Sequence, residues 1–148
     1  MTGWRCGWLV HPASLGDRMG DLSGINNTGA TSFVQHAAAT AIRDGEEFVT
    51  EMVERCRRGR DLVHQRLGGM DRIKLASPKA AFYAFPQIEG LKDDLEFAKY
   101  LVREHRVGLA PGSAFGPDND GFLRLCFAKS EEQLSAAMDR IEAGLKNL

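Results

Sequence analysis

The sequence predicts an α/β fold, a two-layer module of helices packed on a small sheet over residues 61–148. Short apolar runs with strand-like alternation lie between turn-forming residues, and apolar positions elsewhere recur every three or four residues, as in amphipathic helices. Each type of element has one apolar face, and the two faces can bury each other in two layers. Strands are expected at 72–76, 81–88, 107–109 and 122–128, and helices at 93–105 and 130–145.

The N-terminal part has a different pattern. Trp8-Leu9-Val10 could form a short buried strand, whereas residues 12–30, with four glycines, predict a long loop. Ser32-x-x-Gln35 is a capping-box pattern and predicts a helix to about Arg43. After Asp44-Gly45, an apolar stripe predicts a longer helix that ends at Gly68-Gly69.

The overall charge gives no indication of a nucleic-acid or membrane partner. Nineteen basic and twenty acidic residues nearly cancel, so no global field favours an anionic surface. The run Arg55-Cys56-Arg57-Arg58-Gly59-Arg60 is the one dense basic block. It is best explained as the solvated face of a helix, and a phosphate or nucleic-acid patch is the alternative.

Cysteine and histidine usage indicates an intracellular protein without a metal site. The three cysteines are widely spaced and form no CxxC pair, which favours reduced thiols in a cytoplasmic protein. The four histidines have no metal-ligand spacing. No apolar run approaches the roughly 18 residues of a membrane span, and no signal-peptide pattern is present.

Arg124 is the candidate binding residue that the local pattern indicates. It lies in an apolar strand on the same face as Phe122 and Cys126, opposite Leu123 and Leu125. A guanidinium in that setting needs either water or an anion, and its planar fork fits a carboxylate through two hydrogen bonds. An arginine on the wet face of the sheet is the alternative that spacing alone leaves open.

Five segments together resemble the fold-type I, class I/II aminotransferases, which depend on pyridoxal phosphate. The run Thr2-Gly3-Trp4-Arg5-Cys6-Gly7 is similar to the stretch that follows the Schiff-base lysine in that family. Other segments resemble its strands and helices in the same order, although Ala80 stands where glycine is usual. These segments are 32–38, 77–85, 107–116 and 122–128.

The resemblance implies a division of roles. Arg5 would contact the cofactor phosphate and Arg124 the substrate α-carboxylate, while the Schiff-base lysine would lie upstream of Met1. No catalytic residue is then expected within the chain, because none of its six lysines occupies the family position. Residues 1–60 would end the large cofactor-binding domain and include part of a long interdomain helix, and residues 61–148 would form the small domain. The substrates would be an amino acid and a 2-oxo acid, and the enzyme a homodimer.

Three interpretations remain open at this point. The first is the C-terminal portion of such an aminotransferase, inactive alone and not expected to retain the cofactor. The second is a lyase or synthase on the same fold, and the third is a free-standing non-catalytic α/β module that binds a carboxylate or a partner. In each case residues 1–43 would expose apolar surface that favours self-association or mobility.

Overall fold

The computed structural model describes residues 2–148, and the chain divides into two compact units. The first unit comprises residues 1–50 and the second residues 51–148. The helix α3 (Glu46–Gly68) begins in the first unit and continues into the second. The expected domain boundary near residue 60 stays a prediction.

The first unit is almost entirely helical. Two 3-10 turns, η1 (Thr2–Trp4) and η2 (Ala13–Leu15), precede α1 (Gly16–Asn27) and α2 (Ser32–Asp44). Within its described residues, Val34 is the only buried hydrophobic side chain. Several large apolar side chains are more than half exposed: Trp4, Trp8, Leu9, Val10, Leu22, Ile25, Phe33, Ile42 and Phe48.

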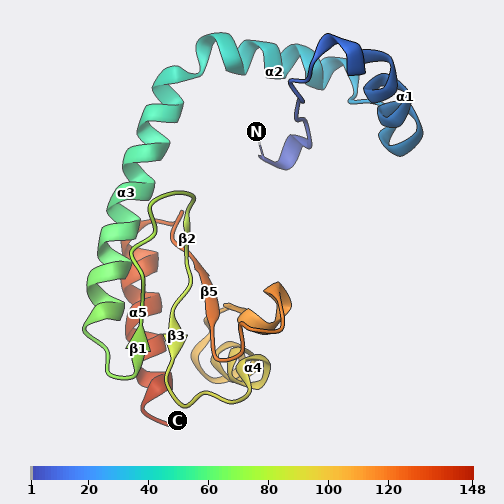
Figure 1. Ribbon diagram of the computed structural model, residues 1–148. Helices are drawn as coiled ribbons and strands as arrows, with labels where there is room; N and C mark the ends of the chain where they lie inside the picture. The colour runs from blue at the N-terminus through green and yellow to red at the C-terminus, as the bar shows by residue number, and fades with distance from the viewer. Residues whose placement is uncertain (1) are drawn as a thin grey trace. The chain divides into compact units, whose positions relative to one another are not determined.

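The second unit contains five short strands in two sheets, with α4 and α5 as its complete helices (Figure 1). One sheet pairs β1 with β3, and the other has the order β2-β5-β4, all antiparallel. Helix α4 has its side-chain cap at Asp93, and α5 has a complete capping box formed by Ser130 and Gln133. The bounds are β1 Ile73–Lys74, β2 Tyr83–Ala84, β3 Gln87–Ile88, α4 Asp94–His105, β4 Ala110–Pro111, β5 Leu123–Cys126 and α5 Glu131–Leu145, with a 3-10 turn η3 at Gly112–Phe115.

One apolar core holds the second unit together. It combines the inward faces of α3, α4 and α5 with alternate residues of β5. Leu101 and Met138 are completely buried, and Leu123, Leu125 and Phe127 are nearly so. Helix and sheet therefore bury one another, which confirms the predicted α/β class.

The arginine-rich block lies in α3, and three of its four arginines, Arg57, Arg58 and Arg60, form ion pairs. Arg57 contacts both Glu54 and Asp61, and Arg58 contacts Glu54 and, on α5, Glu131. These pairs agree with the solvated-helix interpretation. Arg66 adds a further link from α3 to Asp139 of α5, and the two helices lie side by side in Figure 1.

Two expectations for the first unit are wrong. Residues 16–27 form helix α1 rather than part of a long loop. Glycine costs about 1 kcal/mol in a helix relative to alanine, but it keeps its N–H donor and so does not prevent the helix. Trp8, Leu9 and Val10 form no strand, and their side chains are 67–88% exposed.

Three further local expectations need correction. Ser32 is the first helical residue of α2, and its predecessor Thr31 makes no side-chain cap, so the capping box is not formed there. Residues 107–109 are not a strand, because pairing with β5 begins at Ala110. The expected strands 72–76 and 122–128 are shorter than predicted, and 81–88 is split into β2 and β3, which belong to different sheets.

Candidate functional site

Strand β5 presents Arg124 on the partly exposed face of its sheet. The strand alternates, with Leu123 and Leu125 buried and Arg124 and Cys126 half-buried. The neighbouring strands fix its position, since Ala110 of β4 pairs with Arg124 itself. The predicted orientation of Arg124 is therefore confirmed, with its apolar neighbours in the core and its guanidinium directed away from it.

Two aromatic rings flank the Arg124 guanidinium. Its central carbon lies 4.4 Å from the ring centroid of Tyr83 on β2 and 4.3 Å from that of Phe115 at the end of η3. Both distances are within the range of cation–π attraction. Phe115 is supported edge-on by Phe85, with ring centroids 6.0 Å apart, and Phe85 stacks on Phe122 at 5.0 Å. The arginine thus projects from a continuous aromatic wall.

The charge of Arg124 is not matched by an acidic side chain. Nine ion pairs between basic and acidic side chains occur within residues 2–148, and Arg124 takes part in none of them. Aromatic faces stabilise the cation but leave its N–H donors unused. A half-buried guanidinium with unused in-plane donors is suited to bind a carboxylate through two charge-assisted hydrogen bonds.

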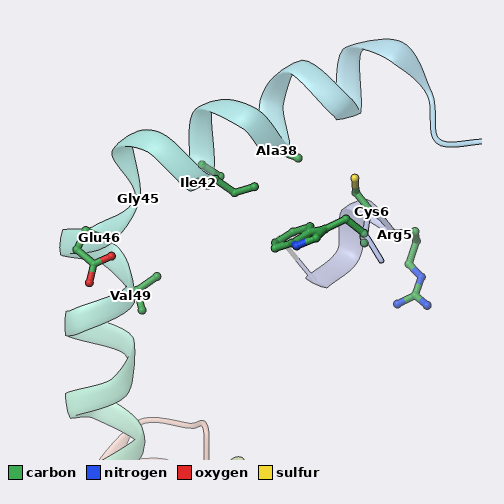
Figure 2. A pocket seen from close by; sticks show the side chains of 10 residues that line it. Arg5, Cys6, Ala38, Ile42, Gly45, Glu46 and Val49 are labelled. Atoms are coloured by element: carbon green, nitrogen blue, oxygen red, sulfur yellow. The ribbon is translucent and has the colours of Figure 1, made fainter. Parts of the chain in front are cut away.

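Arg5 lines a separate pocket of about 690 Å³ within the first unit. The segment Arg5–Trp8 forms one side, and α2 with the start of α3 forms the other, including Ile42 and Glu46. In Figure 2 the Ile42 side chain points toward this segment, whereas the Arg5 guanidinium is turned away from the helices. Arg5 belongs to the first unit and Arg124 to the second.

Metal and membrane features are absent from the described part of the chain. Residues 2–148 contain no group of three or more His, Cys, Asp or Glu side chains placed to hold a metal ion. None of the helices in the same range is both long enough and apolar enough to cross a membrane. All three cysteines are free thiols.

The fold and the arginine site together define an α/β domain in which the half-buried Arg124 guanidinium lies between two aromatic rings. Residues 1–141 match the model of the family "Aminotransferase class I and II", and the chain belongs to this family. It is 41% identical to an aromatic-amino-acid aminotransferase of Thermococcus litoralis and 39% identical to an aspartate aminotransferase of Pyrococcus abyssi. Each alignment covers 99% of this chain and 38% of the relative, so the chain spans about two fifths of the length of these relatives.

Solved structures give the same result. An aromatic aminotransferase from Pyrococcus horikoshii superposes with a TM-score of 0.89 at 38% identity, over 99% of this chain and 40% of that one. An aspartate aminotransferase from Rhizobium meliloti superposes with a TM-score of 0.85 at 32% identity, over 99% and 39%. The enzymes of this family depend on pyridoxal phosphate, as the sequence resemblance implied.

The pocket beside Arg5 has few groups suited to a cofactor phosphate. Arg5 is the one basic residue among the described residues that line the pocket, and its guanidinium is turned away from the helices. No lysine or hydroxyl side chain is among these residues, and Glu46 adds a negative charge. All six lysines lie in the second unit. The pocket therefore does not form a phosphate cup by itself.

The sequence predicts the orientation of Arg124 on its strand but not the residues that surround it. No pattern in the sequence links Tyr83 or Phe115 to Arg124. They lie 41 and 9 positions away along the chain. Only the pairing of β2 with β5 and the turn that follows β4 bring the rings to the guanidinium.

Proposed function

We propose that this chain is the C-terminal part of an aminotransferase that moves an amino group between an amino acid and a 2-oxo acid. The single observation that carries the proposal is the setting of Arg124. This arginine is half-buried, lies between two aromatic rings and has no acidic partner among residues 2–148. The named activities of the relatives support the reaction class. Those relatives include an aromatic-amino-acid aminotransferase and an aspartate aminotransferase.

In this proposal Arg124 binds the α-carboxylate of the substrate. Two parallel hydrogen bonds from one planar guanidinium fix the orientation of the carboxylate as well as its position. Correct orientation of a bound reactant lowers the entropic part of the barrier. Arg5 would contact the cofactor phosphate, and the remaining contacts and the Schiff-base lysine would come from residues outside this chain. Pyridoxal phosphate supplies an electron sink when it is bound in such an enzyme.

The expected assembly rests on the family resemblance, and the expected location rests on the cysteine pattern. We expect a homodimer and a cytoplasmic protein with reduced cysteines. A same-fold lyase or synthase would also use Arg124, and a non-catalytic module would use it without turnover. The named activities of the relatives favour the aminotransferase over both alternatives.

The test uses a full-length enzyme that contains these residues, with amino-acid and 2-oxo-acid pairs as substrates. Arg124→Ala should cost about 2–5 kcal/mol of substrate recognition, because a desolvated carboxylate loses its partner. Cofactor retention should be unchanged. Arg5→Ala should show the reverse, with weaker cofactor retention and a smaller direct effect on the substrate. Equal loss of cofactor in both variants would contradict this division of roles.

The purified 148-residue chain provides a second test. It should not catalyse transamination when mixed with pyridoxal phosphate, because none of its lysines lies at the family position. Any change in the absorbance of pyridoxal phosphate should come from adventitious adducts with exposed lysines. Steady turnover by the pure chain would overturn the assignment of the Schiff-base lysine to a residue outside it.

A further inference from the structure

Asp94 is a buried carboxylate that binds a neighbouring turn rather than its own helix. It lies in the first turn of α4 and is 4% exposed. Its two oxygens accept separate hydrogen bonds from one residue, Ser113 of η3. Oδ2 accepts from the Ser113 backbone N–H at 2.6 Å, and Oδ1 accepts from the Ser113 hydroxyl at 2.9 Å. Hydrogen bonds to an ionised carboxylate are stronger than neutral ones.

The turn that Asp94 holds is packed closely at its start. The N–H of Gly112 donates to the Phe122 carbonyl at 2.8 Å. A Cβ on Gly112 would lie 2.3 Å from the Asn119 carbonyl oxygen and 2.7 Å from the Phe122 Cβ, so only glycine fits. The other end of the turn is held by Asn119, whose side-chain amide donates to the Phe115 carbonyl at 3.1 Å.

Phe115 is the last residue of this turn, and its ring is one of the two that flank Arg124. The ring is 44% exposed, so core packing alone does not fix its position. Asn119 and the Phe85 ring contact Phe115 directly, and the two hydrogen bonds from Ser113 to Asp94 hold the turn two residues before it. The position of the aromatic cover over Arg124 therefore depends in part on a carboxylate that does not itself contact Arg124.

We propose that Asp94 is a positioning residue, which fixes the Gly112–Phe115 turn through Ser113 so that Phe115 covers Arg124 and leaves its in-plane donors to a planar carboxylate. This rests on the proposed function, in which Arg124 binds a carboxylate. Without the bonds to Asp94, the turn and its phenylalanine move relative to the guanidinium. The arginine then becomes more hydrated, and its carboxylate affinity falls.

The test uses the 148-residue chain and the NMR signal of the Arg124 side-chain Nε–Hε group. Ring currents from Tyr83 and Phe115 should shift this signal from the position of an exposed arginine. Asp94→Asn should move it toward that position, because one carboxylate oxygen is replaced by an NH₂ donor. Asp93→Asn is the matched control: Asp93 caps α4 by accepting from the Glu96 N–H, a role that asparagine also fills.

Ser113 gives a second route if Asp94→Asn does not fold. Ser113→Ala keeps the backbone N–H bond and removes the hydroxyl bond, so it should move the Arg124 signal part of the way. Ser113→Thr keeps a hydroxyl and should restore the original position. Ser130→Ala, which removes a hydroxyl at the N-cap of α5, is the control for a general loss of stability.

A carboxylate titration measures the consequence for binding. The probe is 3-phenylpropionate, with 3-phenylpropanol as the neutral control. Asp94→Asn should weaken binding of the acid about fivefold, the equilibrium effect of one net hydrogen bond. An Arg124 signal that stays in place in both Asp94→Asn and Ser113→Ala would overturn the positioning role. Equal affinity of the wild-type chain and Asp94→Asn would overturn the consequence for binding.

The two proposals fail in different ways. If the wild-type chain shows no response of Arg124 to the acid, the carboxylate role of Arg124 is wrong. The dependence of the ring-current shift on Asp94 does not require a ligand, so it would still report on the positioning role.

Discussion

Leu101 and Gly144 lie where α4 packs on α5. Their closeness predicts that the effect of Gly144→Ala on stability changes sign when Leu101 is replaced by alanine. Leu101 is completely buried. A Cβ added to Gly144 would lie 2.6 Å from the Leu101 Cδ2, and the next nearest atom, on His105, would be at an ordinary 3.4 Å. The close contact is therefore with a side chain that a second substitution can remove.

The single substitutions should both destabilise the chain or leave it near neutral. Leu101→Ala should cost about 3–5 kcal/mol, because its site is enclosed and leaves a cavity. Gly144→Ala forces a methyl group against Leu101, which costs about 1–3 kcal/mol. The better helix propensity of alanine returns about 1 kcal/mol of this. The net effect of Gly144→Ala alone is then a loss of about 0–2 kcal/mol.

In the Leu101→Ala background the new methyl group has room. Gly144→Ala then gains the helix propensity of about 1 kcal/mol. It also buries one methyl group in the vacated space, which contributes about 0.8 kcal/mol. The same substitution becomes stabilising by about 2 kcal/mol, so the two sites should couple by about 2–4 kcal/mol, within or slightly above the range for residues in contact.

The assay is native-state hydrogen exchange of the slowest amides in α4 and α5, which reports the opening free energy of the second unit. The control is Gly68→Ala in α3, where an added Cβ would have no atom within 4 Å. It should not couple to Leu101→Ala. If Gly144→Ala had the same effect in both backgrounds, within about 0.5 kcal/mol, the α4–α5 contact described above would be wrong.

Two further predictions concern the charged helix α3 and the first unit. The hydrogen bond from Arg57 holds the pKa of Glu54 below its ordinary 4.5, so the stabilisation from this pair is present above that value and is lost as the pH falls through the lower folded pKa. Arg57→Gln should raise the pKa of Glu54 more than Arg58→Gln does, as measured by carbon-13 NMR titration, and an unchanged pKa would contradict the assignment. Limited proteolysis should cut first at residues 5–12 and 28–31, leaving a resistant core that starts near residue 60, because the first unit buries so little apolar surface. The same surface should produce concentration-dependent self-association in light scattering, and a monomer that is equally resistant throughout would refute both expectations.

The elements that the sequence predicted correctly are those whose signals are local. The helices at 46–68, 94–105 and 131–145 each show a long apolar period, and the capping box of Ser130 and Gln133 forms as expected. The alternation around Arg124 also needs only neighbouring residues to place that side chain on the partly exposed face. These features follow from the geometry of a single helix or strand.

The errors occurred where the partner of a segment decides its conformation. The apolar run 81–88 reads as one strand, but buried Pro86 has no N–H to donate and the chain changes sheets there. Its first residue, Ala81, has a left-handed φ of 61° rather than an extended one, and the register with β5 begins at Tyr83. The sequence does not predict helix α1, because its glycines have low helix propensity and its few apolar residues do not form a clear helical stripe.

The sequence by itself determined the family, the α/β class and the orientation of Arg124 on its strand. Family motifs and side-chain periodicity can be read from the order of the residues alone. Only the tertiary structure decided what surrounds that arginine. Tyr83 reaches it through strand pairing, and Phe115 reaches it through a turn that Asp94, 19 positions from Ser113, holds in place. Such contacts join segments that no local pattern connects, since they form only when separate elements bury their apolar faces against one core.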